Sequence, residues 1–368
     1  MSRVIIVKCE KYSESRKCIE KGLELFGDLE IKEEERVLLK PNLLMAAEPS
    51  KYITTHPLII KYVGEKLKKY GAKLVIGDSP AGRFTKNRLK KVYEMSGMEA
   101  ISKELGIELN YDTSYKKVEI NGRVLKNIEI ANFALNADKI ITFPKMKTHT
   151  LTTFTGAIKI LYGCVPGLRK AYYHGKFPRA GEFSKVLLDV YDAIKTDFVV
   201  MDAIYAMEGS GPSAGKPRKV GLLLFSDDGI AVDVVSCEIL GIPLERVPYL
   251  AILKSEGRIP KIEIEGEDIE EVKINDFKYP KVVNTGRMAN SFILSVLTTI
   301  EKKPYPEHSI CVGCGECYSI CPQRAIKIMN GKAVIDYTKC IKCFCCQESC
   351  PYHAIKLRRI LRNRSHRV

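Results

Sequence analysis

Eight of the thirteen cysteines in this chain fall into two runs with the same internal spacing. Both runs read C-x2-C-x2-C-x3-C-P, and they cover residues 311–322 and 340–351. Each cysteine of the second run lies 29 residues after its counterpart in the first, and the Pro-x-x-Ala-Ile-Lys that follows repeats at the same offset. Thiolates repeated at this spacing are typical of a module that binds two [4Fe–4S] clusters and transfers electrons.

The ligand sets follow from the geometry of such modules. Three cysteines spaced in this way lie on one tight loop, and in two-cluster ferredoxins of the bacterial type the fourth ligand comes from the other run. We expect Cys345, which is left over, to be a small apolar neighbour of the second cluster and not a ligand. The predicted sets are Cys311, Cys314, Cys317 and Cys350 for the first cluster, and Cys340, Cys343, Cys346 and Cys321 for the second.

Other uses of so many cysteines fit less well. A disulfide scaffold needs an oxidising compartment, and the sequence shows no signal peptide. Structural zinc is usually bound by paired C-x2-C knuckles.

No apolar run reaches the roughly 18 residues that a membrane span requires. We therefore expect a cytoplasmic protein, whose oligomeric state the sequence does not indicate.

The 368 residues carry a net charge of +15, which calls for an anionic partner. Nucleic acid, a membrane surface, an acidic redox protein and an anionic substrate are all compatible with that charge. Nucleic acid is the weakest of these because basic residues are not interleaved with aromatic ones and no known module is visible. An anionic small molecule or a redox partner protein is the expected partner.

The first 277 residues alternate between predicted strands and helices. Strands at 36–40 and 73–77 flank a helix that begins at His56-Pro57, which is the pattern of a parallel βαβ unit. Further strands are predicted at 139–143 and 197–202, and a helix from about 152 to 161. The expected fold is α/β, with a large mixed or parallel sheet and flanking helices, followed by a small α+β ferredoxin-like iron–sulfur domain.

Polar residues stand at the ends of several of these strands, and ligands bind at that edge of open α/β sheets. We expect one shared pocket there, built from Lys40/Asn42, Asp78/Ser79, Lys145/Lys147/His149, Asp202/Glu208 and Asp227/Asp228.

Three alternative sites can be weighed against this pocket. The glycine-rich segment 208–216 lacks the P-loop pattern, although a looser anion-binding nest stays open. A metal site would have to combine His56, His149, His174 and Cys164, which share no ligand spacing. A Ser-His-Asp hydrolase is disfavoured because no G-x-S-x-G elbow is present.

An ordered set of short motifs resembles the DUF362 family, whose fused form ends in a 4Fe–4S ferredoxin domain. The resemblance covers most of residues 1–260 together with the cysteine-rich end. The motifs are Val37-Leu-Leu-Lys40-Pro-Asn42, Thr55-His56-Pro57, Ile76-Gly-Asp78-Ser-Pro80, Pro144-Lys145-Met-Lys147-Thr-His149, Gly156-x2-Lys159, Asp202-Ala, Glu208-Gly-x-Gly211-Pro and Asp228-x4-Asp233.

The resemblance implies which residues form the site. The family pattern falls on a mainly cationic set that should favour a carboxylate or phosphate ligand. His149 and His56 are the candidate proton donors, and Lys145 would polarise the ligand. The residues expected to bind it are Lys40, Asn42, Asp78, Lys147 and Lys159.

These inferences divide the chain into a DUF362-like α/β domain (1–277), a connecting segment (278–304) with a short helix near 288–299, a ferredoxin domain (305–357) and a basic tail (358–368). The leading hypothesis is an iron–sulfur oxidoreductase that passes single electrons to an anion bound in the α/β domain. The alternative is an electron carrier or assembly factor whose large domain docks a partner protein.

Overall fold

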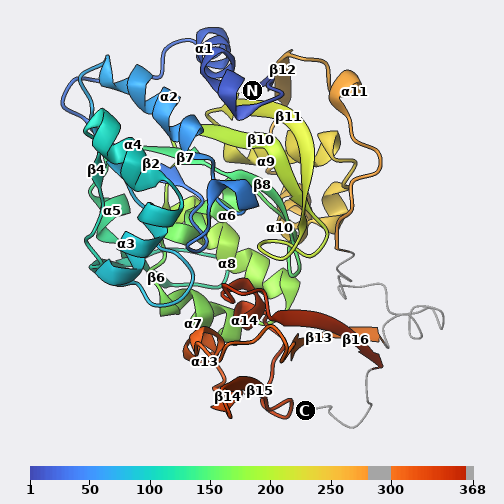
Figure 1. The fold of residues 1–368 in the computed structure, drawn as a ribbon. Helices are drawn as coiled ribbons and strands as arrows, with labels where there is room; N and C mark the ends of the chain where they lie inside the picture. Colours follow the sequence, from blue (N-terminus) through green and yellow to red (C-terminus); the bar gives the residue numbers. More distant parts are fainter. Residues whose placement is uncertain (281–299, 362–368) are drawn as a thin grey trace.

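The computed structural model describes residues 1–280 and 300–361. We call the first range the α/β domain and the second the cysteine-rich module, which lies against the α/β domain at the side opposite the N-terminus (Figure 1). The connecting helix expected near 288–299 lies outside the described residues. Within these ranges, every helix falls short of the length and apolarity needed to cross a membrane.

A ten-stranded mixed sheet forms the centre of the α/β domain, in the order β12-β1-β11-β10-β7-β2-β3-β4, with β8 pairing to β10 and β9 to β8. Strands β10, β7, β2, β3 and β4 are parallel, whereas β11 runs antiparallel to both of its neighbours. The predicted α/β class is confirmed. The strands are β1 (Ser2–Lys8), β2 (Arg36–Pro41), β3 (Lys73–Ile76), β4 (Glu108–Leu109), β7 (Lys139–Phe143), β8 (Lys145–His149), β9 (Thr153–Thr155), β10 (Phe198–Glu208), β11 (Lys216–Ser226) and β12 (Ile262–Gly266), with a separate hairpin of β5 (Tyr115–Glu119) and β6 (Asn127–Ala131).

Helices cover both faces of this sheet because alternate strand residues point to opposite sides. Val4 and Ile6 of β1 belong to one apolar core, and Ile5 and Val7 to the other. The second core includes α1 (Ser15–Phe26), α2 (Pro57–Lys68), α3 (Lys86–Met95) and α4 (Met98–Leu105). The first core includes α5 (Asn132–Leu135), α6 (Ala157–Ile160), α7 (Leu168–Lys176), α8 (Ala180–Ala193), α9 (Gly229–Ile239), α10 (Pro248–Ser255) and α11 (Ile269–Val272).

The cysteine-rich module repeats its backbone conformation as well as its sequence. It contains two antiparallel strand pairs and two short helices: β13 (Ile300–Pro306) with β16 (Ile355–Leu361), β14 (Ile326–Met329) with β15 (Lys332–Ile335), α13 (Glu316–Ile320) and α14 (Cys345–Glu348). The paired strands extend beyond 305–357 at both ends. Left-handed backbone recurs 29 residues apart at Gly313 and Lys342, Gly315 and Phe344, and Arg324 and His353.

Helices α13 and α14 carry much of the contact with the α/β domain (Figure 1). Ile320, Cys343 and Cys345 share a small apolar cluster with Ala171 of α7. Beside it, a Cβ atom on Gly175 would lie 2.8 Å from the ring of Pro322, so the missing side chain lets α7 and the module approach closely.

Two expectations for the α/β domain are wrong. The helix expected over 152–161 begins only at Ala157, because the preceding threonine-rich segment pairs with β8 as strand β9. Asp227 and Asp228 follow β11, which is antiparallel to β10, so they lie at the opposite edge of the sheet from the other predicted site residues. There Asp228 caps α9 by accepting the N–H of Ile230.

Candidate functional site

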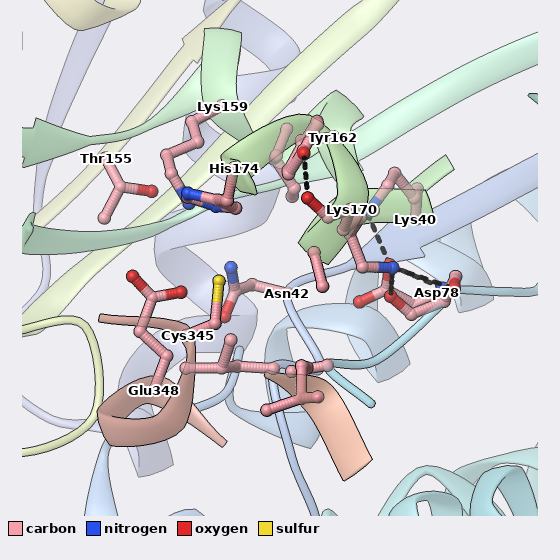
Figure 2. Close-up of a pocket in the computed structure, with 17 residues that line it drawn as sticks. Lys40, Asn42, Asp78, Thr155, Lys159, Tyr162, Lys170, His174, Cys345 and Glu348 are labelled. Carbon is pink, nitrogen blue, oxygen red and sulfur yellow. Dashed lines mark hydrogen bonds and ion pairs between the residues drawn. The ribbon is translucent and has the colours of Figure 1, made fainter. Parts of the chain in front are cut away.

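A pocket of about 660 Å³, counting the space at its mouth, lies where the module meets the α/β domain (Figure 2). The module contributes Ile320, Cys345 and Glu348 to its lining. The α/β domain contributes Lys40, Asn42, Leu44, Asp78, Ser79, Ala81, Thr155, Lys159, Ile160, Tyr162, Gly163, Lys170, Ala171 and His174.

Lys40 and Asp78 form a buried ion pair in one wall of the pocket. Lys40 Nζ lies 2.8 Å from Asp78 Oδ1, and Asp78 also accepts the backbone N–H groups of Leu43 and Ser79. A Cβ atom on Gly163 would lie 2.2 Å from Asp78 Oδ1, so only glycine fits against the pair. Because each charge is neutralised by its partner, Lys40 contributes little net attraction for an anion.

Lys159 is held differently. Its short helix α6 is anchored by Asp233, which accepts the N–H groups of Ala157 and Ile158 at 2.6 and 3.1 Å. No described residue forms a hydrogen bond or an ion pair with Lys159 Nζ, which lies 6.0 Å from the ring centroid of Tyr162. Burial lowers the pKa of Lys159, and the nearby Glu348 carboxylate opposes that shift. Lys159 is therefore the pocket ammonium that an anionic ligand could pair with.

Two further basic residues line the pocket beside it. Lys170 Nζ donates to Ser79 O, Ser79 Oγ and Val165 O at 2.7–2.9 Å, so its three N–H groups are used. The ring of His174 stacks on Phe183, and its Nδ1 has no hydrogen-bond partner among the described residues. Burial lowers the pKa of His174 to about 3, so its imidazole is neutral at pH 7.

Glu348 connects the pocket to His149, which does not line it. Nδ1 of His149 accepts the N–H groups of Leu151 and Thr152, so Nε2 carries the proton. That nitrogen lies 2.9 Å from Glu348 Oε1, without the alignment of a full hydrogen bond. Burial lowers the pKa of His149 to about 4. Burial opposes the shift, but the neighbouring His149 and Lys159 lower the pKa of Glu348 to about 2, so Glu348 is an ionised carboxylate and His149 a neutral imidazole at pH 7.

Lys147 lies behind the pocket and supports Asn42, which lines it. Its Nζ donates to Asn42 Oδ1 at 2.9 Å and to Ile53 O at 2.8 Å. Burial, together with the charges of Lys159 and Lys145, lowers the pKa of Lys147 to about 7. Lys147 thus orients a pocket residue without facing the cavity itself.

Lys145 and His56 belong to a separate cluster. Lys145 Nζ lies 3.0 Å from Asp202 Oδ2 and donates to Tyr12 Oη at 2.6 Å. The ring of His56 stacks on Tyr12 at 3.7 Å, and its Nδ1 accepts the N–H of Leu58 at the start of α2. The pocket lining includes five of the residues expected there, Lys40, Asn42, Asp78, Ser79 and Lys159, but not His56, Lys145, Lys147, His149, Asp202 or Glu208.

The lining also includes residues that were not expected in this pocket, among them Lys170, His174, Cys345 and Glu348, of which His174 had been considered only for a metal site. The sequence marks Cys345 only as the cysteine left over from the two runs. The other three carry no motif that would have singled them out.

The module contains two hollows that match the two predicted cysteine sets. One, of about 310 Å³, is lined by Cys311, Cys314, Cys317 and Cys350. The other, of about 340 Å³, is lined by Cys321, Cys340, Cys343 and Cys346, and also by Cys345.

Sulfur atoms in both hollows accept backbone N–H groups. The backbone N–H groups of Ala325 and Ala354 point at Cys321 Sγ and Cys350 Sγ, at 3.2 and 3.3 Å. Such N–H contacts stabilise the thiolates that bind iron–sulfur clusters. In the described ranges no group of three or more His, Cys, Asp or Glu residues is arranged to hold a single metal ion.

Fold and hollows together define an α/β protein fused to an iron–sulfur module. Two family profiles match the chain: a domain of unknown function, DUF362, over residues 37–238, and a 4Fe–4S dicluster domain over residues 303–351. The chain belongs to the DUF362 family, and its C-terminal module is of the iron–sulfur, electron-transferring kind. The resemblance seen in the sequence is confirmed.

One relative is the "Thylakoid-associated protein sll1697" of Synechocystis sp. (strain ATCC 27184 / PCC 6803 / Kazusa). It is 32% identical over 257 residues, which are 69% of this chain and 78% of that protein.

Two solved structures are more distant. The lactate racemase apoprotein from Thermoanaerobacterium thermosaccharolyticum aligns with a TM-score of 0.42 and 14% identity over 65% of this chain. A protein from Thermotoga maritima aligns with a TM-score of 0.38 and 13% identity over 61% of this chain. The aligned parts are 56% and 57% of those two chains.

Proposed function

We propose that this chain is a cytoplasmic iron–sulfur oxidoreductase that passes single electrons from two [4Fe–4S] clusters to a small anion in the pocket. The first cluster would be held by Cys311, Cys314, Cys317 and Cys350, and the second by Cys340, Cys343, Cys346 and Cys321. Each hollow contains the four cysteines of one predicted set, drawn from both runs, which fits this crossed arrangement. When bound, the clusters supply electrons one at a time.

One observation carries the proposal: Cys345 lines both the pocket and the hollow of the second cluster. The two spaces therefore share a wall, and an electron leaving the second cluster needs no further carrier to reach a ligand in the pocket. Lys159 would pair with the carboxylate or phosphate of that ligand, since a charge-assisted hydrogen bond is stronger than a neutral one. Asn42 would orient the ligand, and the proton that its reduction requires would come from solvent, because Glu348 is ionised and His149 is neutral at pH 7.

The test uses protein reconstituted and reduced with dithionite in the absence of oxygen. Small carboxylates and phosphates are added separately, and cluster reoxidation is followed by visible absorbance and electron paramagnetic resonance. We expect reoxidation by at least one anion and none by its neutral ester. The proposal is wrong if no anion reoxidises the clusters, or if Lys159→Met leaves the reoxidation rate unchanged.

Electrons must also enter the module, and its outer face is suited to an acidic protein. Val312, Ile328 and Tyr352 are 56%, 37% and 49% exposed around the first hollow, and Cys314 is exposed beside them. Residues 303–357 carry seven Lys and Arg but four Asp and Glu. Two of those carboxylates, Glu316 and Glu348, face the α/β domain. This face also favours the second candidate function, an electron carrier that docks a partner protein.

Placing a negative charge on that face should slow its reduction by an acidic donor. We expect Val312→Glu to reduce the rate of electron transfer from a reduced acidic ferredoxin about tenfold at low salt, with the difference shrinking as ionic strength rises. The rate is measured by anaerobic stopped-flow absorbance. The control is Leu25→Glu, which adds the same charge at an exposed position of α1 in the α/β domain and should have no effect. Equal rates for both variants would contradict donor docking at this face.

A further inference from the structure

We propose that Cys345 is a redox-active thiol of the pocket and that the anionic ligand is a small disulfide bearing a carboxylate or phosphate. This inference rests on the proposed function because it names the substrate class of the same pocket. It assigns to Cys345 a role beyond that of an apolar neighbour of the cluster.

The position of Cys345 sets it apart from the other cysteines of the module. The hollow of the second cluster already contains four other cysteines, so Cys345 is not required as a ligand. In the first repeat the equivalent residue, 29 positions earlier, is Glu316, whose carboxylate pairs with Arg88 at 2.8 Å. In the second repeat a thiol takes that place, and Figure 2 shows its sulfur pointing into the pocket between Asn42 and Glu348.

The opposite wall of the pocket independently indicates a ligand. His174 is 3% exposed, yet its Nδ1 has no described partner, and Lys159 beside it is also unpaired (Figure 2). A buried polar group without a hydrogen-bond partner is destabilising, so His174 Nδ1 is suited to a ligand that bonds to it. The Lys159 ammonium selects a negative charge, and Ile160 and Ile320 offer an apolar surface for a short carbon chain.

A disulfide can exchange with the Cys345 thiol, and its reduction takes two electrons, which is the number that two clusters can supply. In the first step Cys345–SH exchanges with R–S–S–R′ to give Cys345–S–S–R and R′–SH, so one S–S bond breaks as another forms. In the second step two electrons, one from each reduced cluster, and two protons convert Cys345–S–S–R into Cys345–SH and R–SH. The sum is reduction of one disulfide to two thiols, with both clusters oxidised by one electron.

The first test looks for the mixed disulfide and not for turnover. Anaerobic, cluster-loaded, oxidised protein is treated with 3,3′-dithiodipropionate, which carries two carboxylates, or with the neutral bis(2-hydroxyethyl) disulfide. Mass spectrometry without reductant should find one adduct, on Cys345, formed at least tenfold faster with the anionic probe. Cys345→Ser should lose the adduct, Cys18→Ser should keep it, and the iron content should stay constant. An adduct absent from Cys345 in the wild type would overturn the inference.

A second measurement separates this inference from the proposed function. If dithiodipropionate reoxidises reduced Cys345→Ser as fast as it reoxidises the wild type, the pocket still accepts electrons and the role of the thiol is wrong. If the Cys345 adduct forms but dithionite-reduced clusters are reoxidised neither by the disulfide nor by any other anion, the proposed function fails. The expected result is that dithiodipropionate reoxidises both clusters in the wild type and in Cys18→Ser, but not in Cys345→Ser.

Discussion

Lys159→Met is expected to weaken the binding of small carboxylates and phosphates about 10- to 100-fold. Lys159 is the pocket lysine whose ammonium is paired with no described residue, whereas Lys40 is paired with Asp78 and Lys170 donates to three oxygen atoms. A hydrogen bond to a charged group contributes about 1.5–3 kcal/mol, which corresponds to that range of affinity. Methionine keeps the unbranched side chain but removes the charge. Anaerobic calorimetry with 3-phosphonopropionate measures the loss.

The matched control is Lys176→Met, which removes an exposed charge from α7 outside the pocket. It should bind the anion as the wild type does, and both variants should keep their cluster spectra. Affinity should also fall as the pH rises, because burial lowers the pKa of Lys159 and the neutral amine attracts the anion less. Equal affinity of Lys159→Met and Lys176→Met would show that another group binds the ligand.

Three cysteines of each predicted set could be grouped from the sequence because their spacing along one loop is a local property of the chain, whereas the fourth was assigned from the crossed arrangement typical of such modules. The two hollows contain the two groups of four cysteines that the spacing predicts. The sheet was predictable for a similar reason, since each buried strand is a short apolar run. The antiparallel direction of β11 was not, because it depends on pairing between distant segments.

Only some of the residues that line the pocket could be predicted from the sequence. Lys145, Lys147 and His149 alternate along β8 and so share one face, but successive members of such a set lie about 6.5 Å apart along a strand. Each therefore meets a different neighbour: Asp202, Asn42 and Glu348 respectively. A strand-end motif shows that these residues lie near the sheet edge, but not which of them reaches the cavity.

The lining supplied by the cysteine-rich module could not be derived from motifs at all. Glu348 and Cys345 enter the pocket because α13 and α14 pack on the α/β domain, and that packing depends on contacts between segments far apart in sequence. Gly175 shows how specific the contact is, since a single Cβ atom there would clash with Pro322. The wall shared by the pocket and the second hollow can therefore be recognised only in the folded structure.

Asp78→Ala is expected to lower the free energy of unfolding by about 3–5 kcal/mol, because it leaves the Lys40 ammonium buried without its partner. The backbone N–H groups of Leu43 and Ser79 lose their acceptor in the same change. Equilibrium urea unfolding of the anaerobic protein, followed by tyrosine fluorescence, measures the loss, since the chain has 18 tyrosines and no tryptophan.

A second substitution and a surface control show whether the stability loss in Asp78→Ala comes from the unpaired buried charge or from a general loss of packing. Adding Lys40→Met to Asp78→Ala should recover part of the stability, since removing both charges costs less than stranding one. Glu99→Ala breaks the exposed pair between Glu99 and Lys103 and should cost at most about 1 kcal/mol. If the double variant is less stable than Asp78→Ala alone, Lys40 is stabilised by something other than Asp78. Partial recovery would instead show that the loss in Asp78→Ala comes from the stranded Lys40 charge, and only a double variant more stable than the wild type would mean that the pair is held at a net electrostatic cost.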